Sequence, residues 1–234
     1  MMVAAVFGKP ENFRVYRDKF FYEGANLGLS SIGIVSIISL FIGAVITMQT
    51  SAMMADWIPP YILGYTTRQS TILEFSPTML SLILAGKVGS NISSEIGTMR
   101  VTEQIDALEI MGVNSRAYLI MPKVLSSVVL FPVLVSYSMF LSIFGGWMIC
   151  VLTGLATPEV YLNGIQSLFD PFTVTYALTK ATVFAFLITS IASYYGYYTT
   201  GGALDVGRSS TKAVVVSSIT ILIANYVITQ VMLL

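Results

Sequence analysis

Residues 124–158 read VLSSVVLFPVLVSYSMFLSIFGGWMICVLTGLATP, which is 35 positions without one charged side chain. A helix of about 20 residues crosses the hydrocarbon core of a bilayer. Charge-free runs of comparable length occupy residues 24–55, 181–204 and 213–234. The sequence therefore predicts an all-α integral membrane protein in which each of these runs contributes one transmembrane helix.

The composition excludes several classes of protein. The 234 residues include 12 basic and 12 acidic side chains, so 10% are charged and the net charge is zero, whereas a soluble domain carries about 25% charged residues. This composition argues against a cytosolic enzyme, a disordered chain and a nucleic-acid-binding protein with a basic surface. With no histidine and one cysteine, no catalytic or metal-binding set is expected, and Cys150 is expected to be a buried apolar residue.

The predicted spans number five. Four lie within residues 29–54, 124–152, 176–200 and 213–233. The remaining span, within residues 71–100, is the least regular, because only residues 75–86 are free of charge and Pro77, Lys87 and Glu95 interrupt the pattern. We expect this helix to place its polar end in water or in a protein interior.

The N-terminal segment, residues 1–28, differs from the rest of the chain. Phe13, Tyr16 and Phe20 recur at helical spacing among basic residues, which predicts an amphipathic helix lying along the membrane surface. A solvated leader is the alternative. The membrane domain then occupies residues 29–234.

The basic residues predict the orientation of the chain. Five spans put ten of the twelve lysines and arginines on the N-terminal side and leave Arg68 and Lys180 on the other. Because cytoplasmic loops are enriched in Lys and Arg, we expect a cytoplasmic N-terminus and a periplasmic C-terminus.

A short helix is expected over residues 102–111, in the cytoplasmic loop between the second and third spans. Thr102 is a candidate N-cap and Gly112 a candidate C′ residue. The spacing puts Glu103, Asp106 and Glu109 on one acidic face, and Ile105, Leu108 and Met111 on an adjoining apolar face. Such a helix is typical of a docking element for a cytoplasmic partner, and the alternative is a solvated connector.

Two motifs carry a resemblance to a known family. Residues 86–114 read GKVGSNISSEIGTMRVTEQIDALEIMGVN, and residues 194–214 read YYGYYTTGGALDVGRSSTKAV. Together with Met48 and Gln49 at the end of the first span, they resemble the MlaE (YrbE) family of ABC transporter permeases. Gly201, Gly202 and Gly207 are expected to form a turn between helices, because no phosphate-binding Lys followed by Ser or Thr accompanies them.

The resemblance implies a permease subunit of an ATP-driven phospholipid transporter in a bacterial inner membrane, serving lipid traffic between the inner and outer membranes and outer-membrane lipid asymmetry. It also implies a homodimer, a cytoplasmic ABC ATPase that binds ATP and Mg, a periplasmic ring of MCE-domain proteins and a STAS-domain protein. No nucleic acid is expected as a partner. Residues 102–111 would be the coupling helix that contacts the ATPase, through Glu103, Asp106, Leu108 and Glu109.

Polar residues near the spans are candidates for contact with a lipid headgroup. A charge at the centre of a transmembrane helix costs about 2.5–3.5 kcal/mol and usually faces the protein interior or water. The candidates are Gln49, Lys87, Glu95 and Lys180, and the alternative for the charged residues is snorkelling to the interface. Lys87 and Glu95, eight residues apart, are expected on roughly the same face.

Two other functions remain as alternatives. An ion-coupled secondary transporter of a hydrophobic or amphipathic substrate would need carboxylates near the middle of its spans, yet Glu74 and Glu95 flank the second span. An intramembrane enzyme would need a general base with a nucleophile or a metal-ligand set. The absence of histidine and of clustered aspartates argues against that class.

Overall fold

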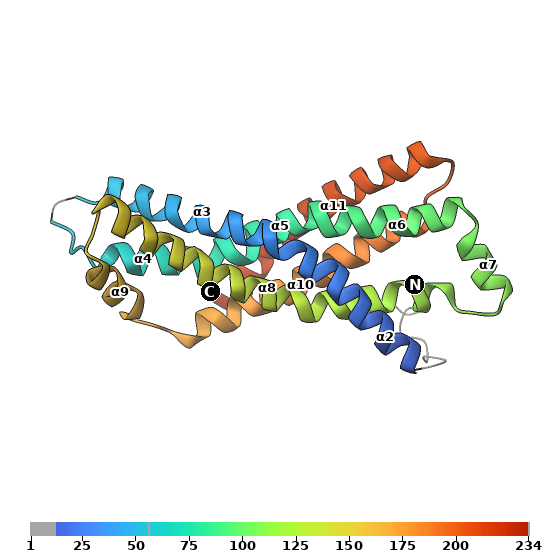
Figure 1. Cartoon of the computed structure of the whole chain (residues 1–234), viewed down its shortest axis with the longest axis horizontal. Helices are drawn as coiled ribbons and strands as arrows, with labels where there is room; N and C mark the ends of the chain where they lie inside the picture. Colours follow the sequence, from blue (N-terminus) through green and yellow to red (C-terminus); the bar gives the residue numbers. More distant parts are fainter. Residues whose placement is uncertain (1–12, 56, 234) are drawn as a thin grey trace. The chain divides into compact units, whose positions relative to one another are not determined.

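The computed structural model describes residues 13–55 and 57–233, and every regular element among them is helical (Figure 1). Five helices are long and apolar enough to cross a membrane, namely Tyr16–Met53, Ile62–Val101, Ser115–Thr153, Pro171–Tyr197 and Ala203–Leu233. The predicted all-α fold with five spans is confirmed. All five helices extend beyond the charge-free stretches, so each of them contains charged residues, and Glu74, Lys87 and Lys180 lie well inside their helices.

The first span begins well before the predicted boundary at residues 28 and 29. Helix α2 (Phe13–Gly24), the π-helical turn η1 (Ala25–Leu29) and α3 (Ser30–Met53) follow one another without a gap. On α2, the Lys19 ammonium lies 3.4 Å from the centroid of the Tyr118 ring. The ring centroids of Tyr16 and Tyr118 are 6.5 Å apart. The surface location predicted for residues 1–28 stays a prediction, and residues 1–12 lie outside the described part.

The second span contains two π-helical segments. Its parts are α4 (Ile62–Ser70), η2 (Thr71–Met79), α5 (Leu80–Leu84), η3 (Ala85–Gly89) and α6 (Ser90–Val101). Pro77 falls in η2 and Lys87 in η3, so two of the three residues that interrupt the sequence pattern lie in the wider turns, whereas Glu95 lies in α6. Proline lacks a backbone N–H, and a π turn accommodates such a local loss of the α-helical ladder.

The remaining elements are α7 (Gln104–Ile110), α8 (Ser115–Thr153), α9 (Pro158–Gln166), α10 (Pro171–Tyr197) and α11 (Ala203–Leu233). Helix α9 was not anticipated from the sequence, although Pro158 occupies its first turn, where a missing N–H carries no cost. By its contacts the chain divides into two compact units. The first unit comprises residues 1–31, 81–131 and 182–234, and the second unit comprises residues 32–80 and 132–181.

In the second unit, α3 and α8 approach each other through small residues. A Cβ atom added at Gly43 would overlap the backbone of Ser142, and one added at Gly145 would overlap the backbone of Leu40. Nearby, Ser39 Oγ donates to Ser138 Oγ at 2.7 Å. Small residues let transmembrane helices pack closely without a hydrophobic driving force between them, so these glycines fix the α3–α8 interface.

A second core of this unit joins α4, α8 and α9. Leu63, Cys150 and Tyr161 form a buried cluster, which confirms that Cys150 is an apolar core residue. Burial raises the pKa of the Tyr161 phenol to about 12, so this hydroxyl stays neutral at any physiological pH.

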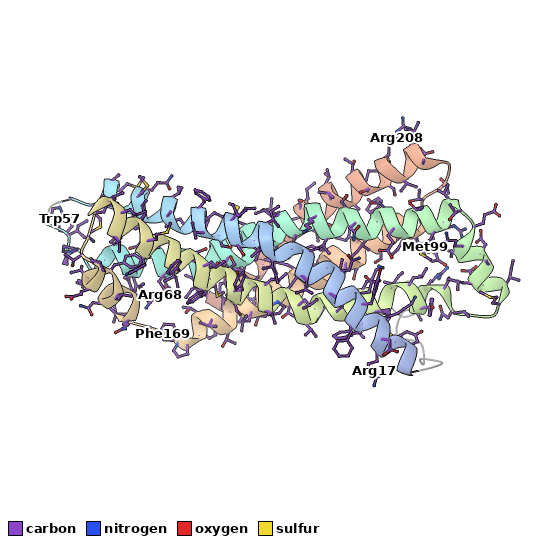
Figure 2. All side chains as sticks on the ribbon, in the orientation of Figure 1. Arg17, Trp57, Arg68, Met99, Phe169 and Arg208 are labelled. Carbon is purple, nitrogen blue, oxygen red and sulfur yellow. The ribbon has the colours of Figure 1, made fainter. Side chains whose placement is uncertain are left out.

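Arg68 lies buried on α4, beside the C-terminal end of α9. Its guanidinium donates to the carbonyl oxygens of Ser167 at 2.8 Å and Leu168 at 3.2 Å, and also to that of Ile165. Figure 2 labels Arg68 and Phe169 in this region, and the guanidinium carbon lies 5.6 Å from the Phe169 ring centroid. Carbonyls at a helix end lack helical partners, so Arg68 satisfies them and holds α9 in place.

In the first unit, α11 packs against α6 and η3. Ser90 Oγ and Ser210 Oγ lie 2.9 Å apart across this contact. Where α6 meets α10, the backbone of Ser93 would collide with a Cβ at Gly196. The first unit thus also depends on small residues at its helix contacts.

We expect Gly145→Val to destabilise the α3–α8 interface by about 1–3 kcal/mol, the usual cost of overpacking. The matched control is Gly33→Ala, also in the second unit, where an added Cβ meets nothing within 4 Å. Thermal unfolding of the detergent-purified protein should show a lower midpoint for Gly145→Val only. Equal midpoints for Gly145→Val and the unaltered protein would show that α3 and α8 are not in close contact.

Candidate functional site

The loop between the second and third spans folds into α7, whose ends differ from the sequence prediction in one respect. The helix begins at Gln104, after Glu103 adopts a left-handed backbone with φ of 61°. Thr102 Oγ1 donates back to the Thr98 carbonyl at 2.8 Å, so its predicted role as N-cap is wrong. The reason is that Thr102 still belongs to the last turn of α6, where its hydroxyl bonds to the preceding turn.

The C-terminal end of α7 is as predicted. Gly112 has a φ of 79°, its N–H donates to the Glu109 carbonyl at 3.0 Å, and the Val113 N–H donates to the Leu108 carbonyl at 3.1 Å. This pair of bonds is the Schellman arrangement that ends helices at a glycine. Gly112 therefore closes α7 and turns the chain toward α8.

Two of the three carboxylates predicted to form an acidic face bind within the chain. Asp106 accepts a 2.5 Å hydrogen bond from Arg100 on α6. Glu109 Oε1 accepts bonds from Ser115 Oγ and Tyr197 Oη, both at 2.8 Å. Glu103 is exposed at the turn that precedes the helix. The acidic residues thus serve mainly to hold α7 to its neighbours.

The apolar side chains of α7 also depart from the predicted face. Ile105 is fully buried, so it belongs to the core of the first unit, and Leu108 is half-buried. The large apolar side chains that reach solvent are Ile110, 88% exposed, and Met111, 68% exposed. The left-handed backbone at Glu103 determines which side of α7 faces the protein. The spacing of the apolar residues predicts that they share a face, but it does not predict the direction in which that face points.

Tyr197 links three helices of the first unit. Its hydroxyl lies 2.9 Å from Ser115 Oγ at the start of α8 and contacts Glu109 on α7, while Tyr197 itself ends α10. The Arg116 guanidinium lies 5.4 Å from the Tyr197 ring centroid. Hydrogen bonds from Ser115 and then Tyr197 lower the pKa of the Glu109 carboxyl below its ordinary 4.5. We refer to Glu109, Ser115 and Tyr197 as the α7 anchor.

A buried ion triad joins α8 to α2 and α6 in the same unit. Lys123 on α8 is 2% exposed, and its ammonium lies 2.6 Å from Glu23 Oε1 on α2 and 2.8 Å from Glu95 Oε2 on α6. Glu23 is also buried, whereas the side chain of Glu95 is partly exposed. Lys123 is the only cation of the triad, so its removal would leave Glu23 as an uncompensated buried charge.

The second unit contains a comparable pair. Lys180 on α10 is fully buried, and its ammonium lies 2.7 Å from Glu74 Oε1 in η2 and 4.3 Å from the centroid of the Tyr176 ring. Thr78 Oγ1 donates to the other oxygen of Glu74 at 3.1 Å. Lys180 is therefore a paired interior lysine in this structure.

The other proposed headgroup residues have different surroundings. Gln49 is exposed on α3. Lys87 donates to the Ser30 carbonyl, while Glu95 binds Lys123, so the structure gives these two residues separate partners although the spacing suggested a shared face. Within the described part of the chain, no three His, Cys, Asp or Glu side chains come together as a metal site would require.

The second motif folds into the end of α10, a turn and the start of α11. Gly201 has a φ of 110°, and Asp205 Oδ2 accepts the Gly202 N–H at 3.2 Å. The predicted glycine turn between helices is therefore confirmed, with Gly201 as its left-handed residue.

The sequence analysis did not identify four residues of the α7 anchor and the ion triad, namely Glu23, Ser115, Lys123 and Tyr197. Glu23 and Lys123 are 100 positions apart, and each borders a charge-free run. A charge at the edge of a span is a signal that a partner is needed, but one sequence does not identify the partner.

Comparison with known proteins decides the family. The family model described as Permease MlaE matches residues 20–231. The chain belongs to this family. The match covers α7, both motifs and all but the outer ends of the first and fifth spans of the permease.

Three relatives of this MlaE-family permease indicate its range. A probable ABC transporter permease protein of Rickettsia bellii is 38% identical over 204 residues, which are 87% of this chain and 79% of the relative. A probable ABC transporter permease protein of Synechocystis is 34% identical, covering 94% of this chain and 83% of the relative. The intermembrane phospholipid transport system permease protein MlaE of Haemophilus influenzae is 28% identical, covering 99% and 89%.

The triad predicts the effect of Lys123→Met in this permease. The change leaves Glu23 buried without a cation, which costs about 3 kcal/mol or more, and the midpoint of thermal unfolding should fall. Glu23→Gln in the same chain removes the orphaned charge and should restore much of the loss. Lys212→Met, at an exposed lysine, is the control. Equal instability of the single and double variants would contradict the triad.

The α7 anchor predicts a dependence on pH. The folded pKa of Glu109 lies below the ordinary 4.5, so its stabilising effect is complete above 4.5 and disappears as the pH falls through the folded pKa. The midpoint of thermal unfolding between pH 6 and 3 should therefore fall more steeply for the unaltered protein than for Glu109→Gln. Parallel curves would show that Glu109 does not stabilise the fold as a carboxylate.

Proposed function

We propose that this chain is the permease subunit of an ATP-driven phospholipid transporter in a bacterial inner membrane, moving lipid between the inner and outer membranes. The family match over residues 20–231 and the name of the Haemophilus relative support the substrate class. The observation that carries the mechanism is α7, a short helix between two spans that is attached at both ends to transmembrane helices.

The proposed assembly contains two permease copies, each bound to a cytoplasmic ABC ATPase that holds ATP and Mg. A periplasmic ring of MCE-domain proteins and a STAS-domain protein complete it. Of the twelve basic residues, ten would lie on the cytoplasmic side with the N-terminus and α7, and the C-terminus would be periplasmic. The ATPase then meets the permease on the side where α7 is exposed.

In this proposal α7 is the coupling helix. Ile110 and Met111 present exposed apolar surface that the ATPase would cover, with Leu108 beside them and Glu103 at the preceding turn. Force applied to α7 reaches α6 through the Arg100–Asp106 ion pair. It reaches α8 and α10 through the α7 anchor. Three spans therefore respond to one docking event.

Lipid tails need only apolar helix faces, and α11 offers one. The exposed large apolar side chains of that helix include Ile219, Leu222, Ile223 and Val227. Gln49 and Lys180 remain proposed headgroup contacts, the latter as the cation of its pair with Glu74. An ion-coupled secondary transporter is the competing proposal.

Reconstitution of the permease with its ATPase in vesicles would distinguish the two mechanisms. We expect movement of fluorescent phospholipid to require hydrolysable ATP and to be indifferent to proton and sodium gradients. Movement driven by an ion gradient without ATP would favour the secondary transporter and overturn the proposal.

The docking surface predicts that Ile110→Arg prevents co-purification of the ATPase, because a charge replaces a side chain that the partner would bury. Trp57→Arg is the matched control, since Trp57 is 83% exposed in the loop between the first and second spans, which the proposed orientation puts on the periplasmic side, away from α7. Helix content and monodispersity should be unchanged in both variants. Co-purification of the ATPase with Ile110→Arg at the level of the unaltered permease would refute the docking role of α7.

Glu103→Lys combined with Asp106→Lys should weaken coupling rather than folding. The changes reverse one charge in the turn before α7 and one on α7, and they break the ion pair between Asp106 and Arg100. In the reconstituted complex, we expect ATP hydrolysis to continue while phospholipid movement falls. Unchanged assembly with unchanged transport would show that these residues do not couple the two activities.

A further inference from the structure

The first unit contains a hollow of about 430 Å³ between the first and second spans. It is lined from η1 and the first residue of α3 on one side, and from η3 and α6 on the other. Its lining includes Asn26, Ser30, Gly86, Lys87, Ser90 and Asn91. The residues of α7 and of the ion triad do not line this hollow.

The chemistry of the lining favours a phosphate group. Lys87 supplies the cation, the side-chain amides of Asn26 and Asn91 supply neutral donors, and no carboxylate is among the described residues that line the hollow. The hydroxyl of Ser30 already donates to the Asn26 carbonyl. Lysine binds phosphate as a point charge, and charge-assisted hydrogen bonds to an anion are about twice as strong as neutral ones. An anion would thus meet attraction here without repulsion from a lining residue.

Lys87 differs from the other lysines of the central spans. Lys123 and Lys180 each lie within 3 Å of a carboxylate oxygen, whereas the partner of Lys87 among the described residues is the neutral carbonyl of Ser30. An ammonium has three N–H donors. A cation in a transmembrane helix is costly when unpaired, so this site is electrostatically complete only when an anion is bound.

The position of the hollow along the spans matches the level of lipid headgroups. Lys87 directly follows the charge-free residues 75–86 of the second span, and Asn26 lies at the start of the charge-free residues 24–55 of the first. The first span therefore reaches the hollow where its apolar stretch begins, and the second span where its apolar stretch ends. A phosphate at that depth belongs to a membrane lipid that lies beside the protein.

The backbone around the hollow is also unusual. Both η1 and η3 are π-helical, and π turns within α-helices are frequent at functional sites. At Gly86 an added Cβ would meet no atom within 4 Å. Gly86, which lines the hollow, thus has room for a Cβ atom.

We propose that this hollow binds the phosphate of an anionic glycerophospholipid, with Lys87 as the cation and the asparagine side chains as further donors. The inference requires only that the chain resides in a bilayer, and it goes beyond the proposed function because a headgroup can be held here without being transported. Loss of transport by the unaltered complex would refute the proposed function and leave this site untouched.

Two variants test the site in different ways. Lys87→Met removes the charge and keeps an apolar stem, whereas Gly86→Leu keeps the charge and fills the hollow. Leucine also has the higher helix propensity, so Gly86→Leu should fold. Arg208→Met, at an exposed arginine of the same unit, controls for the loss of one positive charge.

The measurement is binding of phosphatidylglycerol, phosphatidylcholine and inorganic phosphate to the full chain in detergent, by native mass spectrometry and thermal shift. We expect the unaltered chain and Arg208→Met to prefer phosphatidylglycerol, and both hollow variants to bind it about tenfold more weakly, in keeping with one lost charge-assisted bond. Unchanged phosphatidylglycerol binding by Lys87→Met and Gly86→Leu would overturn the site. A Lys87-dependent stabilisation by inorganic phosphate equal to that by the lipid would overturn the assignment to a lipid.

Discussion

A charged side chain at the centre of a transmembrane helix costs about 2.5–3.5 kcal/mol, and this chain buries Lys123 and Lys180 almost completely. Each lysine is placed within 3 Å of a carboxylate from another helix. The cost of separating such a pair inside the protein is larger than its net contribution to stability. The pairs therefore act chiefly as constraints, because α2, α6 and α8 in the first unit can pack only where Lys123 meets Glu23 and Glu95.

Helix contacts that lack a charged pair depend on close packing, because apolar helices gain little hydrophobic energy from one another inside a lipid bilayer. Gly43 and Gly145 let α3 and α8 approach to backbone contact, and serine hydroxyls bond across the interface. The π-helical turns of the second span provide local freedom within this packing. They contain Glu74 and Lys87, so the irregular backbone occurs where polar side chains must find partners.

The α7 region shows how far sequence reasoning extended and where it stopped. A short helix between the second and third spans, closed by Gly112, follows from local residue preferences, and the structure contains it. The face that it exposes depends on the left-handed backbone at Glu103 and on anchoring by Tyr197, a residue 88 positions from Glu109. Ile105 was therefore expected at the surface and is buried, whereas Ile110 is the more exposed residue.

By itself the sequence determined the membrane class, the five spans and the family, because these depend on long charge-free runs and on ungapped motifs that are local in the chain. Only the tertiary structure decided which charges are paired and which lysine is left beside a hollow. The sequence shows that a charged residue near a span is costly to bury, because that cost depends on the one residue. It does not show which opposite charge offsets the cost, because the partner comes from a distant part of the chain that only folding brings close. Glu23 and Lys123, one hundred positions apart, become neighbours only when three helices pack.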